Sequence, residues 1–176
     1  MICTKETSKA TAVVDTSVWI ALSFAHHVDL LPPFFAKVYL PQSVYQEILR
    51  GEQRVGSAEL HQVTGSWLDL VRSGPVPADI PSALGMGERE ALSIALRASR
   101  SRERVVVLLD DLLARRWAQQ HNIPVLGTLG ILKLARETGV VPSLRPLLEK
   151  LSEAGFHMKH DLYIRIMRQV GEIDTE

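Results

Sequence analysis

The segment VVVLLDDLLARRWAQQHNIPVLGTLGIL, residues 105–132, decides the expected fold. It opens with five apolar residues, 105–109, which are typical of a buried strand, and it continues with a helical pattern over 111–120. Pro124 blocks any extension of that helix, and residues 125–126 predict a further short strand. Strands joined through a helix pair in parallel, so this segment predicts an α/β fold.

The rest of the chain repeats the alternation of strand and helix. We expect a single α/β domain over residues 11–171, with a central parallel sheet flanked by helices in three layers, after a flexible tail at 1–10. One helix-like stretch is expected to end at Pro32-Pro33, and the proline-rich residues 73–81 predict a loop. Further strands are expected at 11–15, 37–40 and 67–71, and helices at 43–50, 52–63, 87–99, 128–139, 143–154 and 160–170.

Composition excludes several classes of protein. With 20 basic and 20 acidic residues the chain has no net charge, whereas a domain that simply coats nucleic acid is strongly basic. The single cysteine makes no internal disulfide, which indicates a reducing compartment. Because neither a signal peptide nor a membrane span is visible in the sequence, we expect a cytoplasmic protein without membrane contact.

Acidic residues recur where predicted strands give way to helices. Asp15 follows the apolar residues 12–14, and Asp110 and Asp111 follow the strand at 105–109. In an open parallel sheet the carboxyl ends of the strands face one crevice, where ligands bind. Carboxylates gathered in such a crevice repel one another unless a cation neutralises them. The pattern therefore predicts a metal site.

Each of these acids also has a structural interpretation. Asp15 can cap the following helix, although Thr16 and Ser17 can do so as well, so that Asp15 is not needed for this role. One of Asp110 and Asp111 can cap the next helix while the other points into the crevice. Thr128, after the last strand, can cap a helix or hydrogen-bond a ligand carboxylate.

Three glutamates lie on helices with one apolar side. Considered without the other acids, Glu47 is expected to be a solvent-exposed residue on the side of the helix 43–50. At ~100° per residue, Glu88 projects near the middle of an apolar face, whereas Glu90 lies just outside its edge. The opposite side of the same helix is expected to be exposed to water and carries Arg89, Ser93, Arg97 and Arg100.

Oxygen ligands suit hard cations, so the expected ion is Mg²⁺ or Mn²⁺. Such an ion activates water and stabilises the charge that develops on a phosphodiester. The chain has no cluster of cysteine and histidine with zinc spacing, no phosphate-binding glycine motif and no nucleophile elbow. The sequence therefore favours metal-dependent hydrolysis over nucleotide binding or serine hydrolase chemistry.

Four blocks of the sequence, in order, resemble the PIN-domain superfamily and particularly the VapC-type toxin ribonucleases. The blocks are VVDTSVWIAL, PQSVYQEIL, GMGEREALSIAL and the segment 105–132, and the final SLRPLLEKLSEAGFHMKHDLYIRIM resembles a prokaryotic subset of that superfamily. The resemblance implies a metal-dependent endoribonuclease that binds Mg²⁺ or Mn²⁺ and hydrolyses RNA. Its implied metal ligands are Asp15, Glu47, one of Glu88 and Glu90, and one of Asp110 and Asp111.

The choice within each acidic pair stays open. Spacing in the family pattern favours Glu90 as the metal ligand, whereas the position of Glu88 on the apolar face of the helix favours Glu88. For the second pair, the family spacing favours Asp111 over Asp110. The resemblance also places Thr16 or Ser17 and Thr128 beside the site, and Arg115 belongs to a set of arginines near the acidic helix ends that can hold an RNA backbone.

The resemblance further implies partners for the chain. A small antitoxin protein is expected to block the crevice, and a homodimer is expected to form through the apolar residues Phe34-Phe35 or 129–134. The alternative function is a non-catalytic PIN-like module that retains its acids for structure and acts by binding other proteins.

Overall fold

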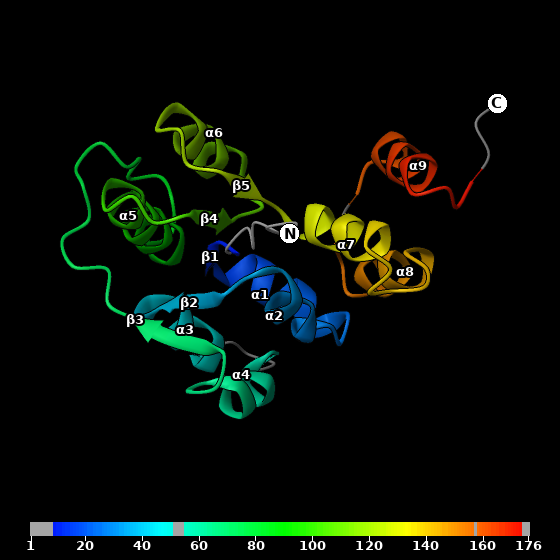
Figure 1. The fold of residues 1–176 in the computed structure, drawn as a ribbon, viewed down its shortest axis with the longest axis horizontal. Coiled ribbons are helices and arrows are strands. Elements are labelled where there is room, and N and C mark those ends of the chain that lie inside the picture. The colour runs from blue at the N-terminus through cyan, green and yellow to red at the C-terminus, as the bar shows by residue number, and fades with distance from the viewer. Residues whose placement is uncertain (1–8, 51–54, 157, 174–176) are drawn as a thin grey trace, which may run out of the picture.

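The computed structural model describes residues 9–50, 55–156 and 158–173. Within them, five strands form one parallel sheet in the order β3-β2-β1-β4-β5 (Figure 1). The strands are β1 (Thr11–Val14), β2 (Lys37–Pro41), β3 (Leu68–Val71), β4 (Val105–Leu108) and β5 (Val125–Leu126).

Helices follow each of these strands, as the alternating pattern predicts. They are α1 (Thr16–Phe24), the short 3₁₀ helix η1 (Val28–Leu30), α2 (Leu31–Phe34), α3 (Gln42–Arg50), α4 (Ser57–Val63), α5 (Met86–Arg100), α6 (Leu112–Gln120), α7 (Thr128–Glu137), α8 (Arg145–Glu153) and α9 (His160–Gln169). Among the residues that the structure describes, no helix is long and apolar enough to cross a membrane.

The sheet separates two hydrophobic cores. Successive residues of a strand point to opposite faces, so Val13 of β1 packs with helices α5 and α6, whereas Val14 packs with α1, α7 and α8. Helices therefore cover both faces, and the expected three-layer α/β/α architecture with a parallel sheet is confirmed. In Figure 1, helices α7, α8 and α9 gather at the end of the molecule away from β3 and α5.

Two local expectations need comment. The prolines expected to end a helix instead stand in the first turn of α2, where a missing amide hydrogen costs little, so that expectation is wrong. The expected helix at 52–63 begins only at Ser57, and its residues 52–54 lie outside the described part of the chain. Most of the expected tail at 1–10 lies outside it too.

The outer side of α5 is not exposed to water as a whole. Ser93 is completely buried and donates to the carbonyl oxygen of Pro75, and Arg97 donates to that of Arg72. The loop after β3 thus packs across the helix. The expectation that this side is exposed to water is wrong at Ser93. Helical periodicity cannot predict which residues a loop from elsewhere in the chain will bury.

The segments expected to supply a dimer surface contribute instead to the core. Phe35 is buried, and Phe34 packs against the core from a partly buried position. In α7, Ile131 and Leu132 are fully buried. Phe34, Leu129 and Leu134 stay partly exposed, and homodimerisation stays a prediction.

Candidate functional site

The carboxyl ends of β1 and β4 form the point where the order of the strands reverses. From β1 the chain builds outward to β2 and β3, and it then returns to add β4 and β5 on the other side. In open α/β sheets such a switch point leaves a crevice at the carboxyl edge. The amide of Asp15 donates to the carbonyl oxygen of Leu108 at 3.2 Å, which ties the ends of β1 and β4 together.

Asp15 stands at this point and is 1% exposed. Its Oδ1 accepts a hydrogen bond from the amide of Val18 at 3.0 Å, and the Ser17 hydroxyl donates to both carboxylate oxygens. Asp15 is therefore the residue that caps α1, a role that the sequence also offered to Thr16 and Ser17.

Burial raises the pKa of Asp15 to about 7, because removal from water disfavours the charged carboxylate. The hydrogen bonds from Val18 and Ser17 oppose this rise, whereas the negative charges of Asp110 and Glu88 add to it. The carboxylates that follow β1 and β4 and that begin α5 thus lie close enough to influence one another.

The acidic doublet after β4 divides its two side chains between two roles. Asp110 accepts from the amide of Thr128 at 2.9 Å and from the Thr128 hydroxyl at 2.6 Å. Asp111 caps α6 by accepting from the amide of Ala114 at 2.8 Å. Asp110 therefore faces the start of α7 at the strand ends, and Asp111 lies at the exposed start of α6.

A glycine allows this approach between β4, α6 and α7. A Cβ atom on Gly127 would lie 2.7 Å from Oδ1 of Asp110 and 2.6 Å from Nη1 of Arg115. The same Nη1 donates to the carbonyl oxygen of Leu109 at 3.0 Å. Arg115 therefore holds a positive charge beside the Asp110 carboxylate.

The two glutamates at the start of α5 point to different neighbours. Glu88 accepts from the amide of Gly85 at 2.8 Å and closes a capping box. Burial raises its pKa, the hydrogen bond from Gly85 lowers it, and the charges of Asp111 and Glu47 raise it further. Glu90 instead accepts from the amide and the hydroxyl of Ser43 on α3, at 3.1 and 2.7 Å.

Glu47 joins three helices at the rim of the crevice. It accepts a short hydrogen bond from the Thr16 hydroxyl of α1 and a 3.2 Å bond from the amide of Gly87 in α5. Gly87 makes this close approach easy, because a Cβ atom there would lie 3.0 Å from Oε2 of Glu47. Glu47 is thus a bridging residue as well as a candidate ligand.

The structure brings together Asp15, Glu47, Glu88, Asp110 and Asp111, and it turns Glu90 toward α3. Oxygen donors alone, with a buried acid among them, suit a hard divalent cation. In the described part of the chain, no three Asp, Glu, His or Cys side chains are already grouped around one point.

Sequence reasoning missed the apolar rim of the crevice. Three residues are exposed there, at the starts of α5 and α6: Met86 at 50%, Leu112 at 69% and Leu113 at 40%. Their neighbours Glu88 and Asp111 are candidate ligands. These apolar side chains are therefore exposed next to candidate ligands in the sequence.

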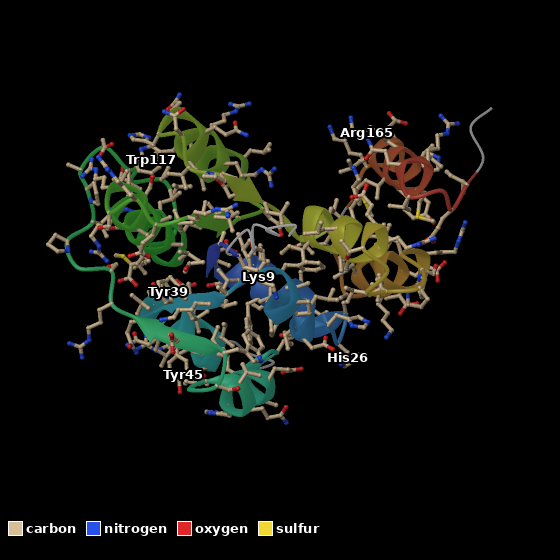
Figure 2. All side chains as sticks on the ribbon, viewed as in Figure 1. Lys9, His26, Tyr39, Tyr45, Trp117 and Arg165 are labelled. Carbon is tan, nitrogen blue, oxygen red and sulfur yellow. The ribbon has the colours of Figure 1, made fainter. Side chains whose placement is uncertain are left out.

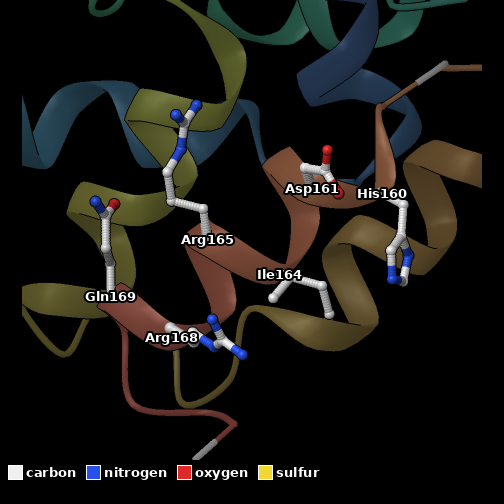
Figure 3. A pocket seen from close by; sticks show the side chains of 6 residues that line it. All are labelled: His160, Asp161, Ile164, Arg165, Arg168 and Gln169. Atoms are coloured by element: carbon white, nitrogen blue, oxygen red, sulfur yellow. The ribbon is translucent and has the colours of Figure 1, made fainter. Parts of the chain in front are cut away.

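A further hollow on the described surface lies away from the acidic crevice. It has a volume of about 710 Å³ and follows one side of α9, where its lining includes His160, Arg165 and Arg168 (Figure 3). No acid of the crevice lines it. The chemistry of the carboxylates, not the size of a hollow, therefore marks the candidate site.

The doubly wound parallel sheet with carboxylates at its switch point defines an α/β protein with an acidic crevice. Residues 11–172 match the family model of the PIN domain, and the chain belongs to that family. PIN domains are commonly nucleases that act on RNA and generally use divalent metal ions. No curated protein matches the chain.

Proposed function

We propose that the protein is a metal-dependent endoribonuclease that hydrolyses RNA phosphodiester bonds with Mg²⁺ or Mn²⁺. One observation carries this proposal: Asp15, completely buried at the switch point of a PIN domain, lies under the influence of other carboxylates. A buried acid surrounded by acids costs folding free energy unless it serves a ligand of opposite charge.

The mutual influence of the acidic charges favours Asp15, Glu88 and Asp110 as the inner ligands. The charges of Glu88 and Asp110 both act on Asp15, whereas those of Glu47 and Asp111 act on Glu88. We therefore assign Glu47 and Asp111 to the margin of the metal site. Glu90 is left out, because its Oε2 accepts from Ser43 on α3 and its charge is not among those that act on Asp15 or Glu88.

A divalent ion bound there supplies a water molecule of lowered pKa and stabilises negative charge on the phosphate. The chain contributes orientation. Thr128 donates both its hydroxyl and its amide to Asp110, which fixes the plane of that carboxylate. Arg115, held by the carbonyl oxygen of Leu109, presents a guanidinium group to a phosphate beside the acids.

The test is cleavage of a labelled RNA by the wild type and by Asp15→Asn, with Mn²⁺ and with a chelator. Asparagine keeps the cap on α1 but removes the charge, so we expect folded protein without activity. Asp161→Asn, at an exposed position in the first turn of α9, is the matched control and retains activity. An Asp15→Asn protein as active as the wild type would overturn the mechanism.

The exposed Met86, Leu112 and Leu113 favour a protein partner at the same site. A small antitoxin that lays an apolar helix on this rim fits the resemblance to VapC-type toxins. The same rim also suits the second candidate function, a non-catalytic PIN-like interaction module. Wild-type protein that cleaves no RNA at any Mn²⁺ concentration would favour that second function.

A further inference from the structure

A polar groove lies at the carboxyl ends of β2 and β3. It has a volume of about 480 Å³, and its lining residues come from α3, α5 and the segment after β3: Gln42, Gln46, Arg72, Ser73, Gly74 and Glu90. Pro41 at the end of β2 pairs with Val71 at the end of β3, directly before these residues. The groove is therefore built on two strand ends.

Several contacts hold the groove in shape. The Arg97 guanidinium donates to the carbonyl oxygen of Arg72 at 3.2 Å and approaches Gly74 so closely that a Cβ atom there would lie 2.6 Å from its Nη1. Gly74 also has a φ of 65°, in the region that favours glycine. Across the groove, the two donors of Ser43 fix Glu90 against α3.

The groove and the acidic crevice share one edge of the sheet, because all strands are parallel and β2 pairs with β1. They also share two helices. On α3, Gln46 of the groove precedes Glu47 of the crevice, and on α5, Glu90 of the groove follows two residues after Glu88. A polymer bound at the crevice therefore passes into the groove if it follows this edge.

We propose that this groove is a subsite for single-stranded RNA next to the phosphate that is cleaved, and this rests on the proposed ribonuclease function. Arg72 binds a phosphate of the flanking nucleotide, and the amide of Gln46 hydrogen-bonds the edge of its base. Glu90, which sequence spacing offers as a metal ligand, instead forms part of the wall of this subsite.

Arg72 and the two glutamine amides of the lining favour RNA as the occupant. The Arg72 side chain is exposed and makes no ion pair or hydrogen bond with another residue of the described chain, so its charge is available to a phosphate. The two glutamine amides each offer donors and an acceptor, which match the edges of unpaired bases. An apolar peptide helix would leave these groups without partners.

The experiment measures binding of a short fluorescein-labelled single-stranded RNA of mixed sequence by fluorescence anisotropy, with chelator present so that no cleavage occurs. Arg72→Ala is expected to weaken binding about 5- to 10-fold and to lower the salt dependence by about one phosphate contact. The matched control is Arg165→Ala, which removes an equally charged exposed residue from the other hollow (Figure 3). Figure 2 shows Arg165 on α9, well apart from Tyr39 on β2.

A second measurement separates recognition of the base by Gln46 from electrostatic binding of the phosphate by Arg72. With Mn²⁺, Gln46→Ala is expected to change the relative cleavage rates of RNAs that differ next to the cleaved bond, whereas Arg72→Ala raises KM for all of them alike. Equal losses from Arg72→Ala and Arg165→Ala, or no loss from either, overturn the subsite. If the wild type cleaves no RNA while its RNA binding still depends on Arg72, the ribonuclease proposal is overturned and the groove is an RNA-binding site without cleavage.

Discussion

Thr128 donates two hydrogen bonds to one carboxylate, with its amide 2.9 Å from Oδ1 of Asp110 and its hydroxyl 2.6 Å from Oδ2. The pair joins the end of β4 to the start of α7, and Thr128 is completely buried. Because both oxygens are held, the plane of the carboxylate is fixed relative to Asp15. Metal ligands commonly receive such support from a neighbouring donor.

Thr128→Val tests this support, because valine has nearly the same shape and lacks the hydroxyl. We expect a loss of about 1–3 kcal/mol in the free energy of unfolding and a ~10- to 100-fold loss of cleavage rate. Urea denaturation and initial rates measure the two effects. Thr128→Ser retains the hydroxyl and is expected to recover most of the activity; equal rates for the valine and serine variants would contradict the role of the hydroxyl.

Glu88 and Glu90 are predicted to differ in their effect on metal dependence. Glu88→Gln removes a charge that acts on Asp15 and is expected to raise the half-saturating concentration of Mn²⁺ by ~10- to 100-fold. Glu90→Gln is expected to leave that concentration as in the wild type, because Glu90 is bound to Ser43. Initial rates over a Mn²⁺ titration decide between them, and the reverse order would assign Glu90 to the metal.

Asp15 is predicted to lower stability at neutral pH in metal-free protein. Its pKa is about 7 in the folded chain, against 3.8 for a free aspartate side chain. Below the lower value both states are protonated and there is no penalty. As the pH rises from there, the unfolded chain ionises first, so folding stability is lost up to the folded pKa and stays low above it, by roughly 4 kcal/mol.

Asp15→Asn cannot ionise and keeps an acceptor for the amide of Val18. With a chelator present, it is therefore expected to be more stable than the wild type at about pH 8 and nearly equal to it at about pH 4. Urea denaturation at both values measures this difference. A difference that does not change with pH would show that burial of the charge is not its cause.

Glu172 is predicted to lock the chain after α9 onto α8. Partial burial acts to raise the pKa of Glu172, but four hydrogen bonds outweigh it and lower the pKa. The donors lie at the start of α8 and on α7: the Leu144 amide, the Ser143 hydroxyl, the Arg145 amide and the Arg136 guanidinium. Because the folded pKa is lowered, this stabilisation is present above 4.5 and is lost as the pH falls through the folded value.

Glu172→Gln is accordingly expected to cost about 1–3 kcal/mol of unfolding free energy at neutral pH, and less in acid. Thermal or urea denaturation over a pH series measures this cost. Glu153→Gln, at the exposed end of α8, is the matched control with little effect. A cost that stays constant into acid would contradict an ionised Glu172.

The order of strands and helices was predictable from the sequence, because apolar runs and helical periodicity are encoded by residues close together in the chain. The strand at β4 and the acids that follow it are visible in the letters VVVLLDD. The covering of Ser93 was not predictable, because the residue that it contacts, Pro75, comes from a loop whose path depends on the whole fold.

By itself, the sequence determined that acids follow the strands of an α/β domain and that its parallel sheet brings their side chains to one edge. It did not determine which member of each acidic pair faces the crevice. The tertiary structure decided the division, since the direction of Asp110 depends on Thr128 in α7 and that of Glu90 on Ser43 in α3. Such partners lie far along the chain, and a hydrogen bond to a distant donor has no signature in local periodicity or composition.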